Sequence, residues 1–145
     1  LMSIQSVKGV QIGDAYQQAA SLGSSAQDEI IGLSSGHIER ASNYAGGIEG
    51  GISNGSVLRV SAALKPISTV PRALRSVDLA DGTAATALHQ RSDTCAVVPA
   101  AVIAQAEVAM VLADALLEKP GGDSLLEAKR NLAGYLEDVA ERTNW

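Results

Sequence analysis

Two short segments of the sequence bring cationic, hydroxyl and carboxylate side chains close together. The first is Lys65-Pro66-Ile67-Ser68-Thr69, where a lysine precedes a rigid proline and two hydroxyl side chains follow. The second is Arg91-Ser92-Asp93-Thr94-Cys95. Ammonium, guanidinium and hydroxyl groups bind anionic oxygen atoms, and a nearby carboxylate can exchange a proton. These residue types predict a site for an anionic ligand with an acid–base group beside it.

A glycine-rich run precedes both segments and carries five glycines in the eleven positions 45–55. Glycine is tolerated where φ must be positive or where a side chain would collide with a ligand. The run has neither the Gly-Lys-Ser/Thr of a Walker loop nor a helix directly after it, so neither standard phosphate-binding motif applies. The run is too irregular for a helix or a strand. Two interpretations stay open, a connector between strands and a loop that faces a ligand.

Each charged or reactive residue also has a structural interpretation. Lys65 is expected at the end of a strand, where a solvated ammonium is the commoner outcome. Asp93 precedes a predicted helix, so it could cap that helix or pair with Arg91 in solvent. No histidine close in sequence is placed to activate Cys95, which favours a small buried thiol. The sequence alone does not choose between these roles.

Composition narrows the class of protein. The chain of 145 residues is the size of one domain, and an apolar content of 46% is enough for a core. A net charge of −5 with no Phe disfavours nucleic acid as a partner. One cysteine and no leader pattern favour the reducing cytoplasm. His37 and His89 lack the neighbouring ligands of a metal site, so no metal is predicted.

The elements that must position these residues are mixed in type. Alternating apolar residues predict strands over 8–12 and 56–64. Residues 22–44 are polar with little periodicity, which predicts a long surface loop with at most a short strand at 29–31. The dipeptide Asp81-Gly82 tolerates the positive φ of a tight turn and predicts an antiparallel hairpin of 73–80 with 83–89.

Two helices follow. Pro99 suits a first helical turn, and residues 100–118 are apolar except at Gln105, Glu107, Asp114 and the last residue, Glu118. A helix that is apolar nearly all round is expected to be buried between layers, and its ionisable groups disfavour a membrane span. The second helix is predicted to be amphipathic and to run to about residue 142, with Ser124 and Glu127 at the spacing of a capping box.

Four stretches carry a more specific resemblance, in order and at matching spacing. They are Leu1 to Gly9 with Ile12-Gly13-Asp14, Asn43 to Gly55, Lys65 to Thr69, and Arg91 to Cys95 running into Val111-Leu112-Ala113-Asp114. The chain resembles the carboxy-terminal part of chorismate synthase. Residues 1–145 are therefore expected to form the carboxy-terminal portion of a single domain. The fold expected is α+β, part of a β-α-β sandwich with antiparallel sheets and a buried long helix.

The resemblance implies a lyase of the shikimate pathway, in aromatic amino acid biosynthesis. The enzyme eliminates phosphate from 5-enolpyruvylshikimate 3-phosphate in a 1,4-elimination that gives chorismate. It needs reduced FMN (FMNH2), which is thought to donate electron density transiently as phosphate departs while its N5 receives the ring hydrogen. NADPH is a candidate reductant. A cytoplasmic homotetramer that binds neither nucleic acid nor membranes is expected.

The resemblance also assigns roles by position. Asp93 is implied as the acid–base residue near flavin N5. The implied cofactor contacts are Gln5, Ser6, Gly50, Lys65, Pro66, Ile67, Ser68, Thr69 and Arg91. Gln105 stands where the family usually has glutamate and Thr94 where proline is common, so neither receives a role. The family's Gly-Glu-Ser-His-Gly-like segment, its active-site histidines and its arginine cluster have no match here, so only part of the site is expected.

Two alternatives accompany the enzyme interpretation. The chain could be a catalytically incomplete fragment that acts only as a flavin-binding or assembly module. The glycine-rich run could instead bind a nucleotide other than flavin, which would give affinity for ATP or NAD without competition from FMN. This second alternative ranks last.

Overall fold

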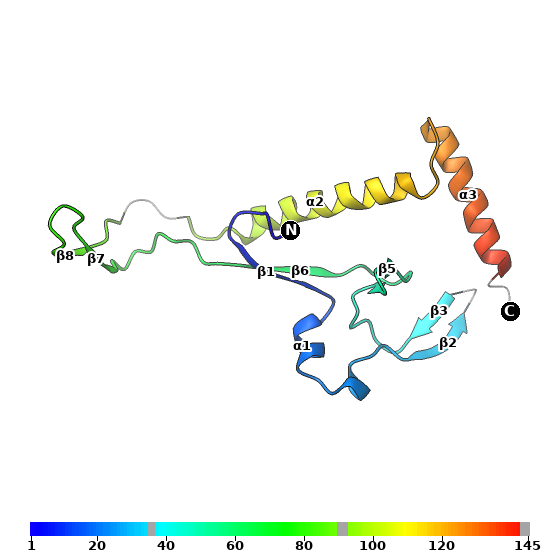
Figure 1. The fold of residues 1–145 in the computed structure, drawn as a ribbon, viewed down its shortest axis with the longest axis horizontal. Helices are drawn as coiled ribbons and strands as arrows, with labels where there is room; N and C mark the ends of the chain where they lie inside the picture. Colours follow the sequence, from blue (N-terminus) through cyan, green and yellow to red (C-terminus); the bar gives the residue numbers. More distant parts are fainter. Residues whose placement is uncertain (35–36, 90–92, 143–145) are drawn as a thin grey trace.

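An antiparallel pair of strands forms the centre of the structure. The computed structural model describes residues 1–34, 37–89 and 93–142, and in it β1 (Val7–Ile12) pairs with β6 (Val60–Leu64) (Figure 1). Val7 lies opposite Leu64 and Ile12 opposite Val60, with an irregularity between Val7 and Gly9. The strand predicted at 8–12 is confirmed. The strand predicted at 56–64 begins only at Val60, because the residues before it turn against the glycine-rich run.

Residues 22–44, predicted as a long loop, instead contain regular structure. After the short helix α1 (Ala15–Ala19) and the 3₁₀ turn η1 (Gly23–Ser25), β2 (Ile30–Ser34) pairs with β3 (His37–Arg40) in an antiparallel ladder. The loop prediction was therefore wrong, except that the short strand allowed at 29–31 overlaps β2. The polar and small residues hid a strand pattern that depends on only a few branched apolar side chains, among them Ile30 and Ile38.

The glycine-rich run also forms a hairpin, so the prediction of an irregular segment was wrong. β4 (Ile48–Glu49) pairs with β5 (Ile52–Ser53), and Glu49 lies opposite Ile52. The two residues between them, Gly50 and Gly51, have φ of +58° and +80°. Positive φ at both central positions is the requirement of the type I′ turn that joins two-residue hairpins. We call residues 48–53 the glycine hairpin.

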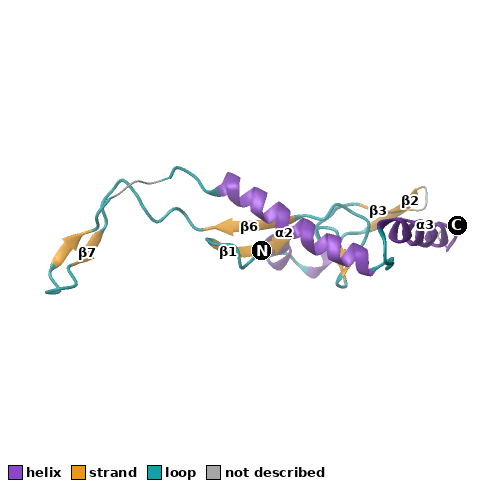
Figure 2. Ribbon diagram, turned by 90° about the horizontal axis from the view of Figure 1, so that it is seen from above, coloured by secondary structure: helices purple, strands orange, loops and turns teal. Residues whose placement is uncertain are grey.

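The hairpin predicted around Asp81-Gly82 is confirmed. β7 (Arg75–Val77) pairs with β8 (Ala84–Thr86). At the turn, the Asp81 carboxylate accepts hydrogen bonds from the Thr83 N–H at 2.9 Å and the Thr83 hydroxyl at 2.7 Å. In both ribbon views this hairpin stands at one extremity of the molecule, away from the other elements (Figures 1 and 2).

Both predicted helices are present as α2 (Val97–Glu118) and α3 (Leu125–Arg142). Pro99 lies in the first turn of α2, as expected. The Glu127 N–H donates to Ser124 Oγ at 3.2 Å, while the Glu127 carboxylate accepts from the Asp123 N–H at 3.0 Å. The cap predicted at Ser124 is therefore confirmed, with the reciprocal bond moved by one residue.

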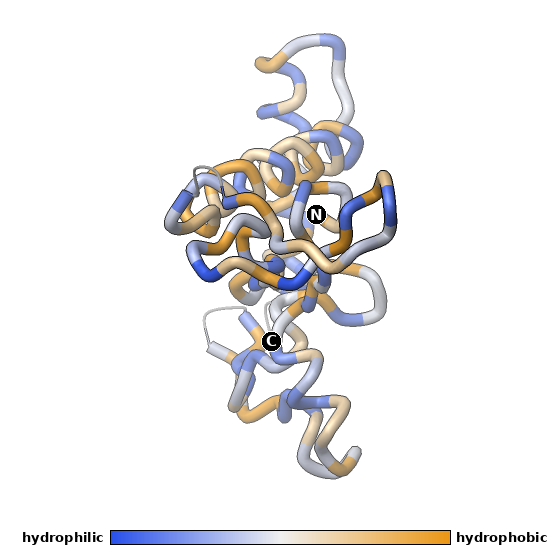
Figure 3. The backbone as a smooth tube through the Cα atoms, turned by 90° about the vertical axis from the view of Figure 1, so that its left-hand side faces the viewer, coloured by the Kyte–Doolittle hydropathy of each residue, from blue (hydrophilic) through white to orange (hydrophobic). Residues whose placement is uncertain are grey.

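The α+β class is confirmed, but the burial predicted for the long helix is not found within this chain. α2 runs beside β6, and the two elements line an open apolar groove of about 770 Å³ (Figures 1 and 2). None of the residues of α2 is buried. No second layer covers its other sides in the part of the chain that the structure describes. Hydrophobic positions occur throughout the trace, as Figure 3 shows.

α2 is also long and apolar enough to cross a membrane, by its 22 residues and composition alone. The same length and composition occur in core helices of soluble proteins. Glu107 and Asp114 lie within the helix, and ionisable groups are costly inside a bilayer. The helix therefore gives only weak support to a membrane interpretation.

Candidate functional site

One end of the β1–β6 pair brings together two of the predicted cofactor-binding segments. The Lys65 N–H donates a hydrogen bond of 2.8 Å to the carbonyl oxygen of Ser6. This bond extends the strand ladder by one step, because Val7 and Leu64 are the last paired residues. Ser6 has φ of +69°, a left-handed conformation that residues with a side chain rarely adopt. The segments 5–6 and 65–69, about sixty residues apart in sequence, therefore meet here.

The side chains at this end are open to solvent. Lys65, Pro66, Ser68 and Thr69 are exposed and Ile67 is half-buried. Proline lacks an N–H and fixes φ, so the chain leaves the strand stiffly at Pro66. Lysine and hydroxyl donors on such a frame match an anionic oxygen or a carbonyl oxygen of a ligand. The segment is therefore accessible for the role predicted for it.

The opposite end of the pair is closed by backbone packed on backbone. The Gly13 N–H donates to the carbonyl of Arg59 at 2.8 Å, and the Arg59 N–H donates to the carbonyl of Gly46 at 3.0 Å. A Cβ at Gly13 would lie 1.9 Å from the carbonyl oxygen of Tyr44, and one at Gly46 would lie 2.3 Å from the Gly13 nitrogen. Close backbone packing therefore explains why position 46 is a glycine. Close packing does not explain the glycine at position 50, because a Cβ there would meet nothing within 4 Å.

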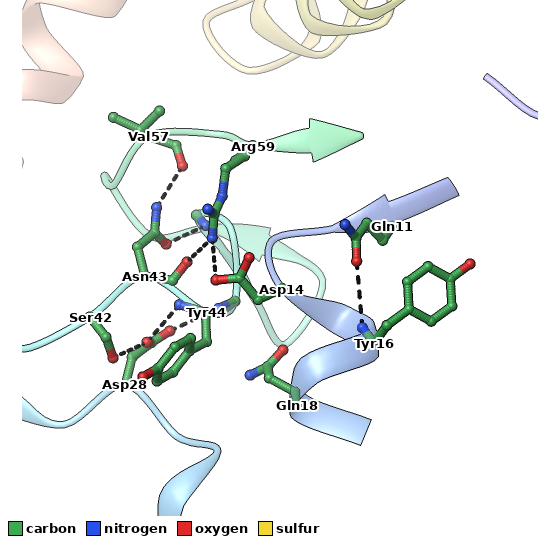
Figure 4. Close-up of polar contacts among 12 residues, drawn as sticks. Gln11, Asp14, Tyr16, Gln18, Asp28, Ser42, Asn43, Tyr44, Val57 and Arg59 are labelled. Atoms are coloured by element: carbon green, nitrogen blue, oxygen red, sulfur yellow. Dashed lines mark hydrogen bonds and ion pairs between the residues drawn. The ribbon is translucent and has the colours of Figure 1, made fainter. Parts of the chain in front are cut away.

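A network of polar side chains surrounds this closed end (Figure 4). The Arg59 guanidinium donates to the Asp14 carboxylate at 2.6 Å and to the Asn43 carbonyl at 3.0 Å. The Asn43 side chain donates to the carbonyl of Val57 at 2.9 Å and accepts from the Gly47 N–H at 2.8 Å. Segments from three parts of the sequence are thus fixed to one another.

Asp28 lies in the same network and accepts three hydrogen bonds. They come from the Ser42 hydroxyl at 2.5 Å, the Tyr44 N–H at 2.7 Å and the Ala45 N–H at 2.9 Å. Burial acts to raise the pKa of the Asp28 carboxyl, but these hydrogen bonds, with the positive charge of Arg40, hold the pKa below its ordinary value. Asp28 is therefore ionised at neutral pH.

An ion pair also holds the first strand of the glycine hairpin. Arg40, at the end of β3, contacts the Glu49 carboxylate at 2.7 Å, and the Asn54 side chain donates to the same carboxylate at 2.7 Å. A polar cavity of about 470 Å³ opens beside these groups. Its lining residues are Ile12, Gln18, Gln27, Asp28, Ala45, Ile48, Glu49 and Gly50.

The second charged segment precedes α2. Arg91, predicted as a cofactor contact, lies outside the described residues, and Asp93 is exposed. Ala96 is the N-cap residue of α2, so Asp93 is not its cap. Cys95 is exposed, and its Sγ accepts from the Val97 N–H at 3.4 Å. The prediction of a buried thiol was therefore wrong, because the residue lies where the chain enters α2, a helix that has no buried residue.

Comparison with known proteins identifies the family. The family model described as chorismate synthase matches residues 1–117. The chorismate synthase of Beutenbergia cavernae is 61% identical over 98% of this chain, and that of Corynebacterium aurimucosum is 57% identical over all of it; each comparison covers 36% of the relative. The chain belongs to the chorismate synthase family. It spans about a third of the length of these curated relatives.

A solved structure confirms the fold of this chorismate synthase segment. A crystal structure titled as chorismate synthase superposes with a TM-score of 0.72 and 40% identity, covering 97% of this chain and 34% of the solved one. The likeness covers nearly the whole chain. The α+β assignment of this chain is therefore supported by a solved relative.

Of the residues predicted for the chorismate synthase site, the structure brings only some together. Gln5, Ser6 and the segment 65–69 share one end of the β1–β6 pair, whereas Gly50 lies beyond the other end. The strand β1 between them is six residues long, roughly 17 Å. Sequence reasoning gave no role to Asp28, Asn43 or Arg59. In the sequence, these three residues appear only as polar residues that flank strands or the glycine-rich run, and this pattern does not indicate a network.

Proposed function

We propose that this chain is the carboxy-terminal part of a chorismate synthase that converts 5-enolpyruvylshikimate 3-phosphate to chorismate by 1,4-elimination of phosphate. Family membership supports the assignment. The observation that supports the cofactor site is the Lys65 N–H bond to the Ser6 carbonyl, which joins the two segments to which the resemblance assigns flavin contacts. The proposal includes a cytoplasmic location and a homotetrameric assembly.

The residues at this end fit reduced FMN. The flavin carries carbonyl oxygens and an anionic phosphate, and the exposed ammonium of Lys65 with the hydroxyl of Ser68 offers donors for such oxygens. Gln5 is exposed beside them and adds an amide. At this end we assign the contacts to Gln5, Ser6 and residues 65–69. Arg91, and Gly50 beyond the opposite end of the pair, are proposed as further contacts. Bound reduced FMN supplies electron density to the substrate as phosphate leaves.

The acid–base role is assigned to Asp93. Its carboxylate is exposed to solvent, and Ala96, not Asp93, is the N-cap residue of α2. A positioned carboxylate holds a proton on one oxygen and returns it as the reaction proceeds. The family's residues that grip the substrate phosphate have no match in this chain, so we assign them to the remaining two thirds of the enzyme. NADPH is proposed as the reductant for the flavin.

The experiment that tests this function uses the complete protein. Its intact mass should be well above the 14.9 kDa of these residues, and it should convert the substrate to chorismate anaerobically with reduced FMN. Normal turnover by a polypeptide of these 145 residues alone would contradict the assignment of only part of the site. Flavin binding by the complete protein without turnover would favour a flavin-binding or assembly module. Binding of ATP or NAD without competition from FMN would favour a different nucleotide.

A further inference from the structure

Asp28 links a distant part of the sequence to the chain that enters the glycine hairpin. Its carboxylate accepts from Ser42, Tyr44 and Ala45, which lie 14 to 17 residues later. Figure 4 shows Asp28 beside Ser42 and Tyr44. The segment continues directly into Gly46 and Gly47, whose close contacts with Gly13 and Val57 leave no room for a side chain. Asp28 therefore fixes the point from which the hairpin starts.

The glycine hairpin needs such support. Its two strands have two residues each, and an isolated hairpin of this length is not stable in water. Backbone hydrogen bonds from the Asn54 N–H to the Gly47 carbonyl and from the Arg59 N–H to the Gly46 carbonyl support it, and side-chain contacts add to them. Asn43 holds the Gly47 N–H, and the Arg40–Glu49 ion pair holds the first strand. Among these supports, Asp28 contributes the largest number of hydrogen bonds from a single side chain to the entry segment.

Asp28 also lies on the same cavity as Gly50. Both residues line the polar cavity of about 470 Å³, together with Glu49 from the hairpin. All three hydrogen bonds to Asp28 require an acceptor, and an ionised carboxylate offers enough lone pairs for them. An asparagine would keep one acceptor oxygen, but its NH₂ group would replace the second oxygen and cannot accept a hydrogen bond from a backbone N–H. The site is therefore specific for a carboxylate.

We propose that Asp28 is a positioning residue of the flavin site, which fixes the glycine hairpin so that Gly50 meets the cofactor. This inference rests on the proposed function, because Gly50 is assigned to the flavin there. We assign no ligand contact to Asp28. It acts through the backbone of residues 42–47 and the hairpin that follows.

The test compares Asp28→Asn with Asp81→Asn in the complete enzyme. Asp81 is a matched control, because its carboxylate also accepts a backbone N–H and a hydroxyl, at the β7–β8 turn. Amide hydrogen exchange of residues 44–54 is measured without flavin, and the Kd for FMN is measured by fluorescence titration. Asp28→Asn should accelerate exchange about tenfold and raise the Kd for FMN about fivefold to tenfold, since bonds to a charged acceptor are the stronger ones. Asp81→Asn should change neither.

Ser42→Ala keeps the test decisive if Asp28→Asn does not fold. It removes one of the three donors and leaves the two backbone bonds, so exchange in 44–54 and the Kd for FMN should each rise about twofold to threefold. Unchanged exchange in folded Asp28→Asn or Ser42→Ala would overturn the positioning role without reference to flavin. Faster exchange with an unchanged Kd would overturn the link to Gly50. Failure of the unsubstituted enzyme to bind FMN would instead overturn the proposed function.

Discussion

The two ends of the β1–β6 pair differ in how their polar groups are satisfied. At the end marked by Ile12 and Val60, the described side chains of Asp14, Asn43 and Arg59 bond to one another and to nearby backbone. At the end marked by Val7 and Leu64, one backbone bond joins Ser6 to Lys65, and the Lys65 side chain is exposed. The first end is a closed network and the second is an open one.

This difference separates framework from binding surface. Polar groups that are already paired within the protein gain little from a ligand, because each new contact must replace an existing hydrogen bond. An exposed donor such as the Lys65 ammonium gives up water and side-chain freedom when a ligand binds, but it breaks no hydrogen bond of the closed network. The glycine-rich run, the most conspicuous feature of the sequence, therefore serves mainly the framework, and the less conspicuous segment 65–69 is the better candidate for direct ligand contact. Gly50, Gly51 and Gly55 are the glycines of the run at which an added Cβ would meet no atom within 4 Å.

The largest effect is expected on turnover, at the segment that follows the open end. Asp93→Asn in the complete enzyme should lower kcat by about two to four orders of magnitude, as loss of a positioned acid–base group does. The Kd for FMN and the Tm should not change. Asp138→Asn, an exposed carboxylate on α3, is the control and should leave kcat unchanged. An equal loss of flavin affinity in Asp93→Asn would assign Asp93 to structure and not to chemistry.

The next effect is on stability, at the closed end. Gly13→Ala should lower the free energy of unfolding of the complete enzyme by about 3 kcal/mol or more, since a Cβ there collides with the Tyr44 carbonyl and φ is +59°. Gly50→Ala meets no atom and should cost about 1 kcal/mol for its positive φ alone. Urea midpoints at fixed protein concentration measure both. Equal urea midpoints for the two variants would mean that close packing at Gly13 does not distinguish it from Gly50.

The open end should show the reverse pattern, with binding lost and stability kept. Lys65→Met should raise the Kd for FMN by about tenfold, the effect of one charge-assisted hydrogen bond. Its Tm should stay within a degree or two of that of the unsubstituted enzyme. Lys8→Met replaces an exposed lysine on β1 and should alter neither quantity. A Lys65→Met protein that unfolds while folded molecules keep their flavin affinity would place Lys65 in the framework.

Sequence reasoning succeeded where a feature depends on neighbours along the chain. The turn at Asp81-Gly82, the cap at Ser124 and the strand at 8–12 each follow from a few adjacent residues. It failed where the cause is distant. Gly13 packs against Gly46, and Asp28 accepts hydrogen bonds from the N–H groups of Tyr44 and Ala45. These contacts join separate segments, so no local sequence pattern encodes them. The apolar composition of α2 indicated that the helix should be covered, but composition does not identify what covers it.

The smallest effect concerns the dependence of the closed end on pH. The folded pKa of Asp28 lies below its ordinary value of 3.8, so ionised Asp28 stabilises the folded state above that pH, and this contribution is lost as pH falls through the folded pKa. The difference in Tm between the unsubstituted enzyme and Asp28→Asn should therefore be constant from neutral pH down to about pH 5 and should shrink below 3.8. Thermal melts across this range measure it. Lys65→Met should show no such convergence with the unsubstituted enzyme. A difference for Asp28→Asn that stays constant down to pH 3 would mean that the carboxylate does not stabilise this end through its charge, and the contrast between the two ends would then rest on backbone packing alone.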